Sequence, residues 1–157
     1  MCKISQRAHR SGYAHLIPAS HKVAFDAHYG DSPKNRHIRA ARLRRALARK
    51  NWTALVAEKD GAVVGYTLGE RTVYDARKRS LFVDPSCQGE GIGSTLFEAS
   101  LADLDDVTVR LRVLRGNERA INLYKEHGFT EVDSADVLFF GAEQIIMERP
   151  PLAVTHH

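Results

Sequence analysis

The sequence predicts a single α/β (α+β) domain, and three observations support that fold class. The chain has 157 residues, 43% of them hydrophobic and 27% charged, which suits one globular domain with a sizeable core. Strand-like and helical patterns alternate along it. The dipeptide Asp60-Gly61 joins two strand-like runs as a hairpin turn does. We expect the domain to cover residues 1–149 and a tail to cover residues 150–157.

The first fifty residues are expected to be mainly helical. Residues 3–7 suggest a short first strand, and residues 11–29 a helical region that Pro18 interrupts, because proline cannot donate the hydrogen bond that a helix interior needs. Residues 36–50 contain seven Lys or Arg and no acid, so the net charge of +4 originates there. The same segment repeats small or apolar residues at helical spacing, namely Ala40, Leu43 and Leu47. We expect an amphipathic helix with a basic outer face.

The basic face of residues 36–50 has two interpretations. It fits an acidic partner such as nucleic acid, an acidic peptide or a phosphorylated cofactor. It also fits a solvated surface, because arginine is a good helix former and its stem covers apolar surface. We favour the solvated surface over a nucleic-acid partner. No membrane partner is expected either, since no segment approaches the ~20 apolar residues that a span needs.

The middle of the chain is predicted to form strands and one helix. Residues 53–59 and 62–68 form the predicted hairpin, because type I′ turns need residues that accept positive φ. Residues 80–83 are a short apolar strand, and residues 91–104 have helical periodicity. A glycine-rich loop joins these last two elements.

The last third of the chain predicts a strand, a helix and two closing strands. Residues 107–113 alternate Val or Leu with Thr or Arg, as a half-buried strand does. Asn117 can cap a helix that ends at Gly128. Residues 129–132 and 137–147 supply two strands, which we expect to be antiparallel to each other.

The glycine-rich loop predicts an anion site. Glycines at 89, 91 and 93 let the backbone approach a ligand, and the first amides of the following helix point outward unpaired. A phosphate or pyrophosphate is the expected ligand. The spacing matches neither the dinucleotide fingerprint nor the P-loop, since Gly93 is followed directly by Ser94. A turn that uses glycine only for its geometry is the alternative.

Two motifs in this part of the chain resemble the GCN5-related N-acetyltransferase (GNAT) family. Gln88, Gly91 and Gly93 fill the family signature Gln/Arg-x-x-Gly-x-Gly/Ala. Residues 117–129 are similar to its second segment, Asn-x-x-Ala-x-x-Leu-Tyr-x-x-x-Gly-Phe. The resemblance implies the GNAT fold, with a central mixed, mostly antiparallel sheet of six to seven strands flanked by about four helices. It also implies an enzyme that moves an acetyl group from acetyl-CoA, without a metal, to a primary amine in a ternary complex.

The resemblance also assigns roles to residues. The loop amides would hold the pyrophosphate, and the main chain of Phe82 and Val83 would pair with pantetheine where two strands splay. Tyr124 would protonate the departing thiolate, although a tyrosine packed in the core is the alternative. Asn117 would hydrogen-bond the pantetheine arm as well as cap its helix. The implied cofactor-binding residues are Phe82, Val83, Gln88, Gly89, Glu90, Gly91, Ile92, Gly93, Ser94, Asn117, Ala120 and Tyr124.

The general base is where the sequence departs from the family. Many members carry a Glu at the position that Arg77 occupies here, and a guanidinium cannot act as a base. Glu70 and Asp75 are the nearby candidates for the general base. Each also fits the alternative of an ordinary solvated carboxylate. An α-amine costs about 1–1.5 kcal/mol to deprotonate at pH 7, against about 4–5 kcal/mol for a lysine-like amine. An α-amine acceptor therefore needs less help from a base.

The acceptor stays open at the level of sequence. Residues 111–117 resemble the ribosomal-protein type of N-terminal acetyltransferase, but Arg112 and Leu114 replace two of its residues. A small amine and a protein N-terminus both stay open as the acceptor. The oligomeric state is open as well, and a homodimer is included. The alternative from another class is a non-catalytic acyl-CoA-binding module whose basic helix docks on an acidic partner. Cys2 and Cys87 form no disulfide framework, which favours the cytoplasm, and we expect no nucleophilic role for Cys87.

Overall fold

A computed structural model describes residues 2–30 and 32–153, and within them the strands form one six-stranded sheet. The strand order is β1-β2-β3-β4-β6-β5, and neighbours are antiparallel except for the parallel pair β3 and β4. The predicted mixed, mostly antiparallel sheet is confirmed. The strands are β1 Trp52–Lys59, β2 Ala62–Arg71, β3 Asp75–Val83, β4 Thr108–Leu114, β5 Thr130–Ser134 and β6 Gln144–Arg149.

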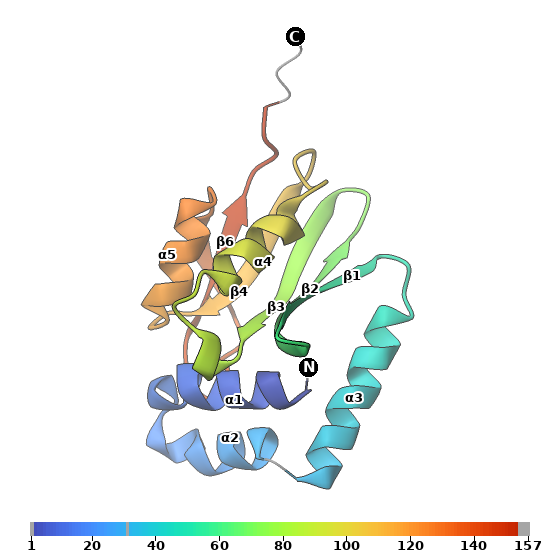
Figure 1. Cartoon of the computed structure of the whole chain (residues 1–157). Helices are drawn as coiled ribbons and strands as arrows, with labels where there is room; N and C mark the ends of the chain where they lie inside the picture. Colours follow the sequence, from blue (N-terminus) through green and yellow to red (C-terminus); the bar gives the residue numbers. More distant parts are fainter. Residues whose placement is uncertain (1, 31, 154–157) are drawn as a thin grey trace.

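The helices form two groups around this sheet. Helices α1, α2 and α3 gather at one end of the sheet, whereas α4 and α5 lie side by side on one of its faces (Figure 1). Their bounds are α1 Cys2–Tyr13, α2 Lys22–Tyr29, α3 Pro33–Leu47, α4 Ile92–Leu101 and α5 Glu118–Glu126. The described residues contain five α-helices, in line with the expected number of about four, and the additional one arises because the region around Pro18 divides into two. In the described part of the chain, no helix is both long and apolar enough to cross a membrane.

The expected first strand is wrong, because residues 3–7 lie inside α1. Ala8 and His9 are buried, and the ring of Tyr13, one turn after His9, packs edge-on against the imidazole at 5.0 Å. That i, i+4 contact belongs to a helix. Five residues of weak alternation carry less information than the helical contacts that continue beyond them.

The hairpin between β1 and β2 is confirmed. Asp60 and Gly61 both have positive φ, 52° and 78°, as a type I′ turn requires. Lys59 pairs with Ala62 across the turn. Strand β2 runs to Arg71, three residues beyond its predicted end.

Strand β4 shows the predicted alternation, and it organises the main core. Val109, Leu111 and Val113 are buried on one face, while Arg110 and Arg112 are exposed on the other. The apolar face packs against Phe97 of α4 and its neighbours.

The last predicted strand is too long, because only Gln144–Arg149 forms β6. Phe140 and Gly141 have positive φ, 47° and 77°, and Phe139 bridges to Ala142. Backbone in that left-handed region cannot continue a strand. The resulting turn packs on the N-terminal helices through a second apolar cluster, which includes Phe25. Of the predicted tail, residues 154–157 lie outside the described part of the chain.

Strands β3 and β4 pair over only three residues before they separate. Asp75, Ala76 and Arg77 pair with Thr108, Val109 and Arg110. Beyond this point β3 stays on β2 as far as Val83, whereas β4 follows β6. The second half of β3 therefore has an edge that no described strand covers.

Candidate active site

A cavity of about 330 Å³ fills the space where β3 and β4 separate. Its wall comes from the second half of β3, residues 110–114 of β4, β6 and helices α1, α4 and α5. Phe82 and Tyr124 line it, and Tyr13 and His9 come to it from α1. An extended ligand can pair there with the open edge of β3, as an added strand would.

The glycine-rich loop lies between β3 and α4 and ends in an open helix terminus. Gly89 and Gly91 have φ of 85° and 79°, a left-handed conformation that costs other residues about 1–2 kcal/mol. Gly91 caps α4, whose first turn closes when the amide of Thr95 donates to the Gly91 carbonyl at 3.0 Å. The preceding amides, those of Ile92, Gly93 and Ser94, have no carbonyl one turn earlier to accept their bonds.

Two cations approach this loop from other elements. The Gln88 side chain donates to the Val83 carbonyl at 3.4 Å and accepts from Nη1 of Arg119 at 3.3 Å. Lys59 of the hairpin donates to Glu90 at 2.7 Å, and this hydrogen bond raises the pKa of the Lys59 ammonium. Sequence reasoning missed Arg119, although it lies within the motif at residues 117–129. A loop flanked by cations has the charge that a phosphate needs.

Asp84 fixes the start of the loop. Burial alone would raise the pKa of its carboxyl, but the Ser86 hydroxyl and amide that donate to it, together with Arg7, lower that pKa below its ordinary value. Arg7 forms an ion pair with Asp84, and this links α1 to the end of β3. The carboxylate is thus charged and held in place at neutral pH.

Tyr124 belongs to both the core and the cavity wall. Its ring lies 5.0 Å from that of Phe97 and 6.2 Å from that of Phe129. Burial raises the pKa of its phenol, and the nearby Tyr13 raises it further. The hydroxyl is therefore protonated at every working pH and is available as a proton donor.

Asn117 caps α5 as predicted. Its side-chain oxygen accepts from the amide of Ala120 at 3.3 Å, and Ala120 packs against the main core. This arrangement sets the start of α5 and, about two turns further on, the position of Tyr124.

The two carboxylates that were candidate bases do not line the cavity with Tyr124. Glu70 is bound to Arg79, and it faces a separate hollow next to α4. Asp75 accepts from the Thr72 hydroxyl at 2.7 Å and lies 3.8 Å from Nε of Arg77. Asp75 starts β3, where β3 and β4 are still paired, so it lies beyond the closed end of the gap.

His9 is a cavity residue that sequence reasoning missed. It is 7% exposed, stacks on Tyr29 with ring centroids 4.0 Å apart, and lies 4.4 Å from the ring of Phe82. It lines the first cavity and also a second one next to it. The i, i+4 spacing of His9 and Tyr13 was the available signal, but the expected strand at residues 3–7 concealed it.

The second cavity, of about 420 Å³, lies between the N-terminal helices and the sheet. Arg39, Arg42 and Leu43 line it, so the inner face of α3 is not the purely apolar one expected. Leu47, assigned to that inner face, is 42% exposed. Burial lowers the pKa of the His28 imidazole in the wall, and Arg42 and Arg39 lower it further.

Lys78 is an unusual cation between the main cavity and the hollow next to α4. It donates to the Ser100 carbonyl. Burial lowers the pKa of its ammonium to about 8, and Arg149 contributes to the shift. Nothing in the sequence pattern marks this residue.

Comparison with known proteins decides the family. The model of the acetyltransferase (GNAT) domain matches residues 50–131, which is more than half of the chain. The chain belongs to the GNAT family. The matched residues of this GNAT protein run from β1 into β5 and include the glycine-rich loop and Tyr124.

One relative of this GNAT protein is similar in sequence, and several solved structures are similar in fold. The N-alpha-acetyltransferase RimI of Mycobacterium tuberculosis is 32% identical over 96 residues, 59% of this chain and 61% of that protein. The PaiA N-acetyltransferase of Thermoplasma acidophilum, solved with coenzyme A, is 18% identical with a TM-score of 0.72, over 95% of this chain and 89% of that one. The ribosomal-protein-S18-alanine N-acetyltransferase of Escherichia coli is 19% identical with a TM-score of 0.65, over 90% and 95%. At these identities the structures support the fold alone.

Among the described residues, no three His, Cys, Asp or Glu side chains cluster in a way that could hold a metal ion. Cys87 lies in the short turn before the loop, with its Sγ 3.7 Å from the Ser86 hydroxyl, and it lines neither of the two cavities.

Proposed function

We propose that this GNAT protein transfers an acetyl group from acetyl-CoA to a primary amine by direct attack in a ternary complex. The observation that carries the proposal is the first cavity, in which Tyr124 and the open edge of β3 meet at the strand separation, while the glycine-rich loop follows the end of β3. The proposal joins this geometry to the family to which the chain belongs.

The residues at the strand separation fit acetyl-CoA. The amides of residues 88–94 would bind its pyrophosphate, helped by the dipole of α4 and by Arg119. The main chain of Phe82 and Val83 would pair with the pantetheine arm, and Asn117 and Ala120 would border the arm at the start of α5. When bound, acetyl-CoA supplies the activated acetyl thioester.

Tyr124 is proposed as the general acid. Its phenol is protonated at neutral pH and lies in the wall of the first cavity, so it can give a proton to the departing sulfur. Its ring is fixed by Phe97 and Phe129, which holds the hydroxyl in one place without an ordering cost at the moment of reaction.

His9 is proposed to accept the proton of the amine. It is part of the wall of both cavities, where an acceptor entering from the second would meet a thioester in the first. A neutral imidazole is suited to this at neutral pH. Glu70 and Asp75 line neither cavity, so each stays a candidate base only if another group carries the proton to it. Glu70 could act through a water molecule, whereas Asp75 lies beyond the closed end of the gap.

The acceptor is proposed to present an α-amine or a similarly weak base. The cost of deprotonation at pH 7 is about 1–1.5 kcal/mol for such an amine, which one histidine can meet. The RimI relative is named for N-alpha-acetylation, and this supports the same class of amine here.

Thiol release from acetyl-CoA with a panel of amines tests the proposal. The panel should contain α-amino acids, short peptides with free N-termini and polyamines, and acetyl-CoA affinity should be measured by calorimetry in parallel. Release with at least one amine is the expected result. Tight binding with no release from any amine would leave only the non-catalytic acyl-CoA-binding module.

A further inference from the structure

We infer that the amine acceptor carries a carboxylate, which binds the arginines of the second cavity. The substrate class would then be an α-amino acid or a peptide with an acidic N-terminal residue. The inference rests on the proposed function and adds the chemical class of the acceptor to it. The shared chemistry is a primary amine with a carboxylate a few bonds away.

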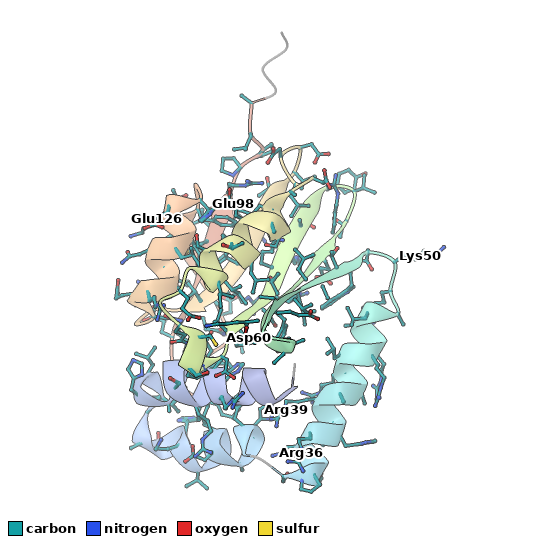
Figure 2. The ribbon with its side chains drawn as sticks, in the orientation of Figure 1. Arg36, Arg39, Lys50, Asp60, Glu98 and Glu126 are labelled. Carbon is teal, nitrogen blue, oxygen red and sulfur yellow. The ribbon has the colours of Figure 1, made fainter. Side chains whose placement is uncertain are left out.

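The charge of the second cavity is the first observation. The α3 residues in its wall are Arg39, Arg42, Leu43 and Ala46, a spacing of i, i+3, i+4 and i+7 that belongs to one helix face. Figure 2 shows Arg39 on the side of α3 that faces α1 and α2, and Lys50 pointing away from the molecule. Arg39 is thus half-buried and turned inward, where a solvated surface would not place it, whereas Arg42 lines the cavity from an exposed position.

Unpaired donors are the second observation. Only one nitrogen of Arg39 has a described acceptor, because Nη1 donates to the His28 carbonyl at 3.0 Å. Its Nε and Nη2 are buried without an acceptor among the described residues, and so is Nε1 of Trp52 in the same wall. A buried donor left unpaired costs about 1–3 kcal/mol, and more if it is charged. A carboxylate satisfies such a site, since a guanidinium binds it through two parallel N–H bonds.

The absence of negative charge in the wall is the third observation. Among its described residues the second cavity is lined by Arg39, Arg42 and Arg79 but by no Asp or Glu. Glu70 lies nearby and is bound to Arg79. The lowered pKa of His28, due to burial and then to Arg42 and Arg39, reflects the same positive field. That field opposes a polyamine and attracts an anionic amine.

The arrangement of the two cavities gives the substrate an orientation. They share His9, Ser80 and Phe82 in their walls, whereas Arg39 and Arg42 belong to the second cavity alone. An acceptor can therefore place its amine at the shared wall, next to the thioester, and its carboxylate toward α3. A cavity of about 420 Å³ is within the range of small-molecule sites.

Matched acceptors test the inference. We expect kcat/KM to be at least about 10-fold higher for glutamate than for glutamine α-amide, which carries no carboxylate, or for Glu-Ala-Ala amide than for Gln-Ala-Ala amide, since a charge-assisted hydrogen bond is worth about 1.5–3 kcal/mol. The first pair identifies a free amino acid as the source of the carboxylate and the second a peptide. Turnover that is equal within both pairs, or fastest with spermidine, would overturn the inference.

Variants of α3 test whether Arg39 causes the preference for a carboxylate substrate. Arg39→Met should lower kcat/KM about 10-fold for the better carboxylate substrate and leave its neutral partner unchanged. Arg44→Met is the matched control, because Arg44 is exposed on the same helix and lines neither cavity. Arg39→Lys keeps the positive charge but loses the two parallel N–H donors, so it should retain part of the preference for the carboxylate substrate. An equal loss with both substrates, in a variant whose circular dichroism is unchanged, would contradict the inference.

Calorimetric binding separates this inference from the proposed function. Glutamate and the acidic peptide should bind in the presence of coenzyme A more tightly than their neutral partners, and Arg39→Met should remove the difference. Carboxylate-dependent binding without turnover would reject the acetyl transfer and keep the anionic ligand. Turnover without carboxylate dependence would reject the anionic acceptor and keep the transferase.

Discussion

The two sites proposed for this protein rely on different kinds of chemical group. The proposed acetyl-CoA site relies on backbone: the open edge of β3 beside the first cavity and, beyond the end of that strand, two left-handed glycines and the free amides of α4. The proposed acceptor cavity is made of side chains that α1, α2, α3 and the sheet bring together. Backbone features follow from short stretches of sequence, whereas the side-chain cavity exists only in the folded chain.

Tyr124→Phe should have the largest effect. We expect kcat to fall by about 10²–10⁴, the usual contribution of a general acid, while acetyl-CoA affinity and the free energy of unfolding barely change because the ring still packs on Phe97. Stopped-flow thiol release and calorimetry measure the two quantities. Tyr74→Phe is the control, since Tyr74 is 87% exposed. Full activity of Tyr124→Phe across the pH range would remove the phenol from the mechanism.

Lys78→Met should change stability in a pH-dependent way. Its pKa is about 8 in the fold and 10.5 as a free side chain, so the folded state binds fewer protons between these pH values. The free energy of unfolding of the natural protein should therefore rise from pH 8 to 10.5. Below pH 8 the buried charge costs at most about 3 kcal/mol.

Urea unfolding of Lys78→Met checks this. The variant should be more stable than the natural protein by about 1–3 kcal/mol at pH 7 and equal to it near pH 10.5. Lys59→Met, at an exposed lysine paired with Glu90, should bring no such gain. A gain of the same size at both pH values would show that packing, and not the charge, is responsible.

His9→Gln probes the wall that the two cavities share. We expect kcat to fall about 10-fold to 100-fold at pH 7 if His9 takes the proton of the amine. The loss should shrink as pH rises, because more of the acceptor is then already deprotonated. A loss that is independent of pH would show that His9 only supports its stacking partner, Tyr29.

Gly91→Ala tests the backbone of the loop and should have the smallest of these effects. Its φ of 79° is strained for alanine by about 1–2 kcal/mol, which corresponds to roughly 10-fold weaker binding of coenzyme A if the loop shifts. The KM for the amine should be unchanged. Gly12→Ala is a suitable control, because nothing lies within 4 Å of its added methyl group. Unchanged coenzyme A affinity would place the pyrophosphate elsewhere.

The contrast between the cavities also explains what the sequence could predict. Asp60-Gly61, the Asn117 cap and the alternation of β4 are local signals, and each of these elements is found in the structure. His9 and Arg39 depend on how α1 and α3 pack on the sheet, and no short pattern encodes that packing. The turn at Phe140 was missed for a related reason, since its left-handed backbone is stabilised by the apolar cluster around Phe25.

Mass spectrometry of a single turnover tests the central claim most directly. The purified protein would be mixed with one equivalent of acetyl-CoA and an excess of glutamate or Glu-Ala-Ala amide, and the masses of amine and protein would be followed together. The account predicts that the acetyl group appears on the amine, that the protein mass never changes, and that Tyr124→Phe slows the transfer. An acetyl group on the protein, or coenzyme A bound with no acetylated amine from any acceptor, would contradict it.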